Sequence, residues 1–458
     1  MKPASVATAT PLDTPKVPAS GEPWRPIHYL GSKLRALASI GEALDAVSEP
    51  NARVYDLFAG SGTVSRWLAN TRPVTAVDIQ EYSRVICSAL LNPAQVDTQS
   101  VTRDIQYMMD SSESFGVHYA AAPLIELEVE AIDRASRGDA LLLADMIEAG
   151  SLMTANTEIA NKSVRKAFHE AKGRISALTG HDPQASMVLR HFGGIYFSHR
   201  QAADLDVILA FAHSSKKLER ETLVAAALSS ASELVNTVGK QFAQPIRPRS
   251  KQGSIKPGLV NLAMRDRLRN TLSAYTNSIE KYASQPNAAY SCIAIRSDYR
   301  DLMASTAFDG GVVYADPPYT RDHYSRFYHV LETMALRDDP AISSNTVRGK
   351  TSPSRGAYRE GRHQSPFCIR SQAPEAFDEL FSGVAKKGMP IVVSYSPYAA
   401  EKDAHPRVME MGAVEEIAGR YYTKVELVSV GEFFHSRLNR SDLNKEIARE
   451  AEFLLLCK

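Results

Sequence analysis

Short apolar runs, each ended by polar or turn-forming residues, divide the chain into strand-like and helix-like regions. Two strand-like runs come early, in RVYDLF and PVTAVDI, with a glycine turn and the start of a helix between them. This succession is the opening of a parallel sheet with helical connections. The same texture returns near the C-terminus in CIAIRS, GVVYAD, PIVVSYS, KVELVSV and EFLLLCK. We therefore expect an α/β fold whose strands come from two separate blocks of sequence.

The region between the two blocks, residues 93–287, has mainly the periodicity of helices. Segments such as ERETLVAAALSSASELVN repeat apolar residues at helical spacing, and few runs resemble strands. The chain has 458 residues, more than the roughly 250–300 residues that one core usually serves. We predict a Rossmann-like sheet domain, residues 25–92 and 288–458, interrupted by a large, mainly helical insertion.

The composition is that of a soluble protein in a reducing compartment. The chain is 44% hydrophobic and 23% charged, and no apolar run approaches the roughly 18 residues of a membrane span. Its four cysteines are scattered singly, which predicts neither a zinc site nor a disulfide framework, so we expect no metal and a cytoplasmic location. Residues 1–24 mix Pro, Ala, Ser and Thr without an apolar core, which predicts a flexible tail and no secretory signal.

One stretch of the helical region is strongly basic although the net charge of the chain is only +1. Residues 239–269 contain eight cations against Asp266 alone. The cations are Lys240, Arg247, Arg249, Lys251, Lys256, Arg265, Arg267 and Arg269. Such a segment suits contacts with nucleic-acid phosphates, for which Arg247, Arg249 and Lys251 are the candidates. A solvated linker remains the alternative.

The turn after the first strand has the residues of a nucleotide-binding loop. In DLFAGSG, Asp56 to Gly62, glycines allow a ligand to approach the backbone, and the following helix offers free amides. The next strand ends at Asp78, eighteen positions after Gly60, a spacing typical of an acid that binds ribose hydroxyls. A nucleoside cofactor is favoured over a purely structural turn. The chain lacks the Lys-Ser/Thr pair of a P-loop here, and it lacks the full dinucleotide fingerprint.

The stretch DPPY, Asp316 to Tyr319, follows a strand directly, so its carboxylate points into the crevice where open α/β sheets bind ligands. Asp316 and a backbone carbonyl fixed by the prolines can accept hydrogen bonds from an exocyclic amine. Tyr319 offers a stacking surface for a base turned out of its helix. Taken alone, DPPY also suits a plain turn at the end of a strand. Upstream, HYLGSKLRAL contains an aromatic ring, Tyr29, and a cation, Lys33, although this pattern alone also suits a helix N-cap.

These motifs in this order resemble those of Dam-like, alpha-group DNA adenine-N6 methyltransferases. YLGSK comes first, then DLFAGSG, an acid at the end of the next strand, a long intervening region, SDYRDL and DPPY. The resemblance implies a Rossmann-like methyltransferase sheet, S-adenosylmethionine as cofactor, and double-stranded DNA from which the target adenine is flipped. It also implies that residues 93–287 recognise the DNA target.

The resemblance assigns roles residue by residue. It implies cofactor binding by Tyr29, Lys33, Asp56, Phe58, Gly60, Gly62, Asp78 and Asp298. It implies a catalytic role for Asp316, Pro317, Pro318 and Tyr319.

Two further segments suit contacts with DNA. TRDHYSRFYHVLETM, directly after DPPY, interleaves cations with aromatic rings, and its candidates are Arg321, His323 and Tyr324, with Arg326 nearby. An amphipathic helix is the alternative for this segment. RGKTSPSRGAYREGRHQS predicts a mobile loop that closes on DNA, with an idle surface loop as its alternative.

The sequence therefore predicts a site-specific adenine-N6 DNA methyltransferase. Cytosine-N4 in DNA, or an amine in RNA, remains a second acceptor class because related Pro-Pro motifs serve both. A non-catalytic DNA-binding module on the same fold is the third hypothesis. Restriction–modification, phage and regulatory roles all agree with these motifs.

Overall fold

The computed structural model describes residues 24–31, 33–155, 159–180, 182–318, 324–347, 349–395, 408–430 and 452–458. A sheet of seven strands has the order β3-β2-β1-β4-β7-β9-β8. The strands are β1 (Val54–Asp56), β2 (Val74–Asp78), β3 (Ile293–Arg296), β4 (Val312–Ala315), β7 (Ile391–Tyr395), β8 (Val425–Ser429) and β9 (Phe453–Cys457). Each lies in one of the seven apolar runs noted above, so the predicted mixed α/β fold is confirmed.

The sheet is mainly parallel. β3, β2, β1, β4 and β7 pair in parallel, whereas β9 pairs antiparallel with both β7 and β8. From β1, the chain order proceeds outward through β2 and β3 on one side and through β4 and β7 on the other. The order therefore reverses between β1 and β4, and open α/β sheets bind ligands beyond the carboxyl ends of such a pair.

Helices cover both faces of the sheet, as a buried parallel sheet requires. Alternate residues of β4 sort to opposite cores: Val312 and Tyr314 face one, and Val313 and Ala315 face the other. The first core includes α1 (Leu37–Val47) and α2 (Thr63–Leu68). The second includes α13 (Tyr299–Ala304), α16 (Ala373–Ala385) and α17 (Met411–Ala418).

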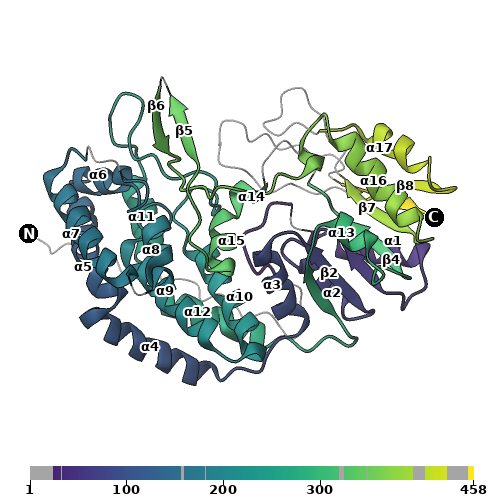
Figure 1. Ribbon diagram of the computed structural model, residues 1–458, viewed down its shortest axis with the longest axis horizontal. Helices are drawn as coiled ribbons and strands as arrows, with labels where there is room; N and C mark the ends of the chain where they lie inside the picture. Colours follow the sequence, from purple (N-terminus) through teal and green to yellow (C-terminus); the bar gives the residue numbers. More distant parts are fainter. Residues whose placement is uncertain are drawn as a thin grey trace, which may run out of the picture.

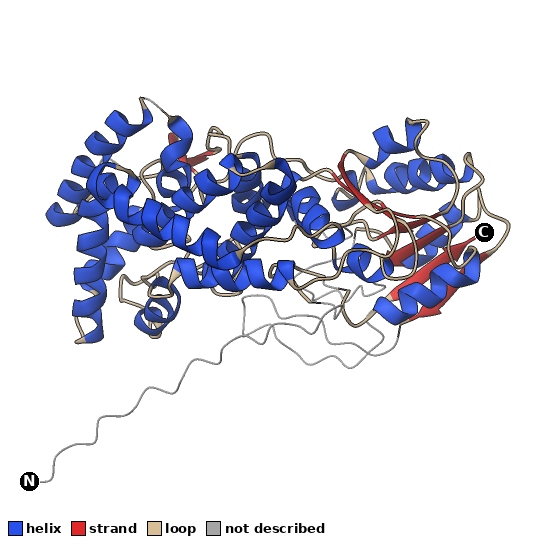
Figure 2. Cartoon of the chain, turned by 90° about the horizontal axis from the view of Figure 1, so that it is seen from below, coloured by secondary structure: helices blue, strands red, loops and turns tan. Residues whose placement is uncertain are grey.

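The sheet lies at one end of the molecule, and a group of helices forms the other end (Figure 1). Figure 2 shows the strands of the large sheet gathered at one end and this group at the other. Its elements are α4 (Thr98–Phe115), α5 (Val117–Ser136), α6 (Leu141–Ala149), α7 (Lys162–Thr179), η1 (Pro183–Ser186), α8 (Met187–Phe192), α9 (His199–Ser214), α10 (Lys217–Leu234), α11 (Leu259–Arg267) and α12 (Thr271–Ala283). Polar caps set several starts; Asp97, for example, accepts hydrogen bonds from the amides of Gln99 and Ser100.

One apolar core joins this group to the sheet. Helix α10 packs against α3 (Glu81–Leu91) and α15 (His329–Leu336), and all three contribute to that core. The short helix α14 (Tyr324–Phe327) precedes α15. The helices before and after the predicted boundary at residues 92–93 thus contribute buried residues to one common core.

The segment expected to be a mobile loop, residues 348–365, includes one strand. β6 (Lys350–Pro353) pairs antiparallel with β5 (Ser344–Val347), which lies before the segment, and η2 (Pro366–Cys368) follows the segment. Its closing on DNA stays a prediction. Most of the predicted N-terminal tail, residues 1–23, lies outside the described residues, and Trp24 packs edge-on against Tyr282 at 5.1 Å between ring centroids. In the described ranges, no helix is both long and apolar enough to cross a membrane.

Candidate active site

A pocket lies at the carboxyl ends of β1 and β4, where the strand order reverses. Residues from both sequence blocks form its walls. It is lined by Tyr29, Leu30, Gly31, Lys33, Leu57, Phe58, Asp78, Ile79, Gln80, Tyr82, Ser297, Asp298, Tyr299, Asp316, Pro317, Pro318, Tyr324, Ser325, His363, Gln364, Ser365, Pro366 and Cys368. Most of the predicted cofactor and catalytic residues therefore come together in one cavity.

The glycine turn after β1 brings backbone and a carboxylate together at the pocket. Gly60 has a φ of +53°, and the ring of Tyr29 lies against its Cα, so a side chain here would meet both backbone strain and a collision. The amide of Gly60 donates to Asp78 at 2.9 Å, and the amide of Gln80 donates to the other carboxylate oxygen at 2.9 Å. Burial raises the pKa of Asp78, and these two amides oppose that shift. The carboxylate is thus fixed at the end of β2.

Besides Gly60, two predicted cofactor residues of this turn, Asp56 and Gly62, do not line the pocket. Asp56 is buried and accepts a hydrogen bond from the Ser65 hydroxyl at 2.6 Å. Burial raises its pKa to about 7, although the Ser65 hydrogen bond opposes the shift. Gly62 has a φ of +72°, and Cys87 and Leu90 pack against its Cα. Their direct contact with a cofactor stays a prediction.

The aromatic wall near Tyr29 is built from two sequence blocks. The ring of Tyr29 stacks on that of Tyr328 at 5.0 Å, and Tyr328 stacks in turn on Tyr82 at 5.4 Å. The Tyr328 hydroxyl accepts a hydrogen bond from the Leu30 amide at 2.8 Å. This stack fixes the segment that leads into Lys33.

A buried ionic triad lies beside the pocket. The ammonium of Lys33, whose side chain is 5% exposed, is 2.8 Å from Asp316 Oδ2 and 2.8 Å from Glu452 Oε1. Ser394, at the end of β7, donates its hydroxyl to the same Glu452 oxygen at 2.6 Å. One cation is therefore shared by two carboxylates, and the sequence did not predict Glu452. Its only signal was a carboxylate directly before the last apolar run.

Burial, Lys33 and Glu452 all shift the pKa of Asp316. Burial raises the pKa of Asp316 to about 6; Lys33 lowers it, and the nearby charge of Glu452 raises it. At neutral pH the carboxylate is mostly ionised and can accept a hydrogen bond, whereas mild acid protonates it. Asp316 thus combines the acceptor role predicted for it with a pKa close to physiological pH.

The rest of the DPPY stretch is described only in part. Pro317 and Pro318 line the pocket, and the Pro318 carbonyl accepts a hydrogen bond from the Cys368 thiol at 3.7 Å. Tyr319, Arg321 and His323 lie outside the described residues. Tyr324 does line the pocket.

Another part of the pocket wall comes from residues 363–368. Residues 363–365 end the segment expected to be a loop that closes on DNA, and the sequence predicted no site role for residues 366–368. Residues 363–368 contribute several lining residues, and the Phe367 ring lies 5.4 Å from that of Phe58 and 5.5 Å from that of Tyr299. Asp298 caps α13 by accepting from the Arg300 amide at 2.9 Å. Burial lowers the pKa of His363, and the carboxylates of Asp298 and Asp78 oppose this.

A family comparison agrees with this geometry. The D12 class N6 adenine-specific DNA methyltransferase family matches residues 29–162 and 254–386, more than half of the chain. The chain belongs to this family. The matched ranges include the glycine turn, Asp78, Asp298 and Asp316, whereas Glu452 lies beyond them.

Three curated relatives are DNA methylases by name. Modification methylase LlaI of Lactococcus lactis subsp. lactis is 24% identical over 189 residues, 40% of this chain and 27% of the relative. Type II methyltransferase M.NlaIII of Neisseria lactamica is 28% identical over 166 residues, 34% of this chain and 43% of the relative. Type II methyltransferase M.FokI of Planomicrobium okeanokoites is 36% identical over 87 residues, 19% of this chain and 12% of the relative. The alignments therefore span less than half of each relative.

The basic stretch of this D12-class chain is largely neutralised by internal partners. Lys240 and Arg265 both bind Asp266, Arg267 is buried against Glu128, and Arg269 pairs with Glu233. Arg249 pairs with Asp145 and Glu148 of α6, so its guanidinium already has two carboxylate partners. Arg247 and Lys251 have no carboxylate partner among the described residues. DNA contacts by Arg247, Arg249 and Lys251 stay predictions.

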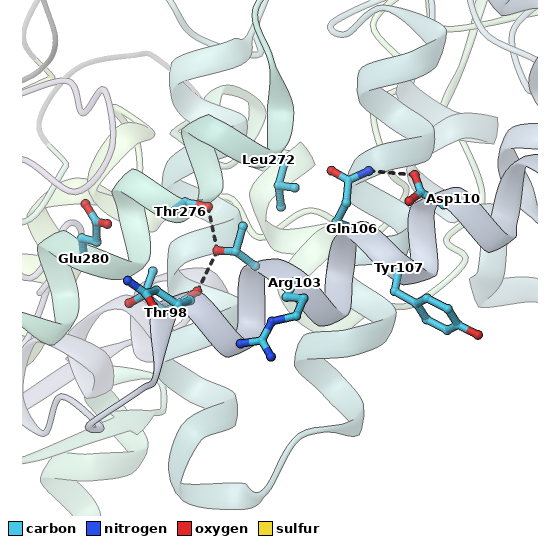
Figure 3. Close-up of a pocket in the computed structure, with 10 residues that line it drawn as sticks. Thr98, Arg103, Gln106, Tyr107, Asp110, Leu272, Thr276 and Glu280 are labelled. Carbon is cyan, nitrogen blue, oxygen red and sulfur yellow. Dashed lines mark hydrogen bonds between the residues drawn. The ribbon is translucent and has the colours of Figure 1, made fainter.

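A second concavity, between α4 and α12, has none of the family's motifs. Some of its polar residues bond to one another (Figure 3): Gln106 donates to Asp110 at 2.8 Å, and the Thr102 hydroxyl bonds to both Thr276 and the Thr98 carbonyl. Within the described ranges, no three potential metal ligands gather in either concavity or elsewhere.

Proposed function

We propose that this chain transfers a methyl group from S-adenosylmethionine to the N6 amine of an adenine in double-stranded DNA. The observation that supports this most is the meeting of Asp316, Phe58 and Asp78 in one pocket at the reversal point of the sheet. Family membership supports the same chemistry. Because the alignments span less than half of each relative, the activity, the substrate and the site roles are our proposal.

The lining of the pocket fits an adenosine-containing cofactor. Asp78 offers a fixed carboxylate for ribose hydroxyls, Asp298 offers one for an amine, and Phe58 offers an apolar ring face. S-adenosylmethionine would supply an electrophilic methyl group. Asp316 and the Pro317 carbonyl would accept the two amine hydrogens, which orients the nitrogen lone pair toward the methyl donor. The ionised Asp316 could also take up the proton that the amine loses.

We also propose that residues 93–287 recognise the DNA target. Helix α10 of this region packs against α3, and α3 contributes Tyr82 to the lining of the pocket. Arg247 and Lys251 are its candidate phosphate contacts, and we keep Arg249 as a weaker one because two carboxylates already bind it.

Asp78→Asn should weaken S-adenosylmethionine binding by roughly 10- to 100-fold, the range expected for one hydrogen bond to a charged group. The rate of transfer at saturating cofactor should change little, because Asp78 is proposed to bind the ribose hydroxyls and not the reacting methyl group or amine. Calorimetric titration of cofactor into the protein without DNA measures the effect. Asp309→Asn, which changes an exposed carboxylate before β4, is the matched control. An unchanged Kd for Asp78→Asn would remove this residue from the cofactor site.

Expression in cells that lack DNA methylation tests the function itself. Genomic DNA and RNA from these cells should be digested to nucleosides and analysed by mass. N6-methyladenine in DNA is expected, whereas N4-methylcytosine or a methylated RNA base would favour the second acceptor class. If purified protein binds DNA but releases no S-adenosylhomocysteine, the non-catalytic hypothesis would replace the proposal.

A further inference from the structure

Two arginines flank one tyrosine ring at the edge of the pocket. The guanidinium carbon of Arg326, on α14, is 4.7 Å from the ring centroid of Tyr358, and that of Arg362 is 5.1 Å from it. Arg326 also donates to the Tyr358 hydroxyl at 3.1 Å. Both guanidinium groups therefore lie close to the same aromatic ring.

The local backbone is shaped to hold this ring. Ala357 has a φ of +48°, a conformation that residues other than glycine rarely adopt and that often marks a functional position. Gly356 leaves room for the ring, because a Cβ there would lie 2.5 Å from the Tyr358 Cζ. The Tyr358 hydroxyl donates to the Ala243 carbonyl, and the ring of His329 meets the Tyr358 ring edge-on at 5.0 Å.

The positive charge of this pair is not matched by a carboxylate of the described residues. Neither Arg326 nor Arg362 forms an ion pair there, whereas the adjacent Arg359 binds Asp338 at 2.6 Å. Burial and the charge of Arg362 lower the pKa of His329 to about 3, so this histidine adds no charge of its own. Burial and the charge of Arg326 lower the pKa of Arg362. The fold therefore keeps two like charges together, an arrangement that a bound anion would stabilise.

The position of the pair indicates which anion. Tyr324 and Ser325, directly before Arg326, line the pocket, and so do His363 and Gln364, directly after Arg362. α14 lies between the sheet and the helical group (Figure 1). A guanidinium fork matches the geometry of phosphate oxygens. A base entering the pocket from a duplex would bring its own backbone phosphates to this edge.

We propose that Arg326 and Arg362, held on Tyr358, form a binding site for a backbone phosphate of the DNA next to the flipped base. This inference rests on the proposed function. Such a contact fixes the position of the duplex and does not read its sequence.

Salt-dependent DNA binding tests the site. Arg326→Gln/Arg362→Gln should weaken binding of a short fluorescent duplex of mixed sequence. It should also reduce the slope of log affinity against log salt by about 1, the value for one lost phosphate contact. Arg326→Lys/Arg362→Lys, which keeps the charge, should retain most of the slope. Arg420→Gln/Lys424→Gln removes two exposed, ion-paired cations outside residues 93–287 and should behave as wild type.

The outcomes separate this inference from the proposed function. A folded glutamine variant with the wild-type slope overturns the phosphate site, and the arginines then only brace Tyr358. If the double variant does not fold, the single variants decide: each must show weaker binding and a shallower slope. Cofactor affinity, measured without DNA, should be unchanged in all of them. A wild-type protein that neither binds nor methylates DNA would instead refute the proposed function.

Discussion

Asp316→Ala should reduce methyl transfer by about two to three orders of magnitude, the typical cost of removing one preorganised polar group at a reacting atom. Asp316 follows β4 directly, and its carboxylate is fixed by Lys33 at 2.8 Å. Without it, only the Pro317 carbonyl would orient the amine. Single-turnover transfer of a labelled methyl group to DNA measures the loss.

Cofactor binding should respond much less, because Asp78 and Asp298, the proposed adenosine contacts, are untouched. Asp316→Asn refines the test: it keeps an acceptor oxygen but removes the charge, so its rate should lie between wild type and Asp316→Ala. Asp309→Asn serves as control for a carboxylate removed from the same sequence region. A wild-type rate in Asp316→Ala would end the catalytic assignment.

The sheet was predictable because each strand is a short apolar run with a polar end. Parallel strands bring their carboxyl ends to one edge, so the meeting of DLFAGSG and DPPY at the pocket was predictable, whereas the strand order that makes β1 and β4 neighbours comes from the structure. Glu452 was not predictable in the same way. It reaches Lys33 because β9 runs antiparallel between β7 and β8, so the start of β9 lies at the edge where its neighbours end. Strand direction depends on long-range pairing that no local pattern encodes.

For the basic stretch, residues 239–269, the sequence predicted the charges but not their partners. Counting charges predicted a free positive surface, yet Arg267 is buried against Glu128 and Arg249 pairs with α6. The partner carboxylates come from helices far along the chain. Conversely, Arg326 and Arg362 belong to segments judged ambiguous, and only the fold brings them to the same ring. Local charge counts therefore could not separate neutralised cations from unpaired ones.

The Lys33 triad predicts opposite pH shifts for two variants. The ionised carboxylate of Asp316 is the stronger hydrogen-bond acceptor and can take up a proton, so kcat/KM for DNA should fall as the pH drops through its pKa of about 6. Glu452→Gln removes a charge that raises this pKa. The low-pH fall of kcat/KM, here called the acid limb of the pH–rate profile, should therefore move to lower pH by roughly one unit. Lys33→Met removes the charge that lowers it and should move the limb upward by roughly 1–3 units. Measuring kcat/KM for DNA across pH at saturating cofactor gives the acid limb of each variant.

Shifts of the acid limb in opposite directions would distinguish electrostatic control of Asp316 from a general loss of stability. Lys33→Met leaves two carboxylates without their shared cation, and breaking a buried pair in this way costs ~3–5 kcal/mol of stability. A merely weakened fold would lower the rate at every pH without moving the limb, and it would not move the limb downward in Glu452→Gln. Limbs that stay in place in both variants would show that Glu452 and Lys33 do not set the ionisation of Asp316. A downward shift in Glu452→Gln alone would already assign this residue a positioning role, since it touches Asp316 only through Lys33.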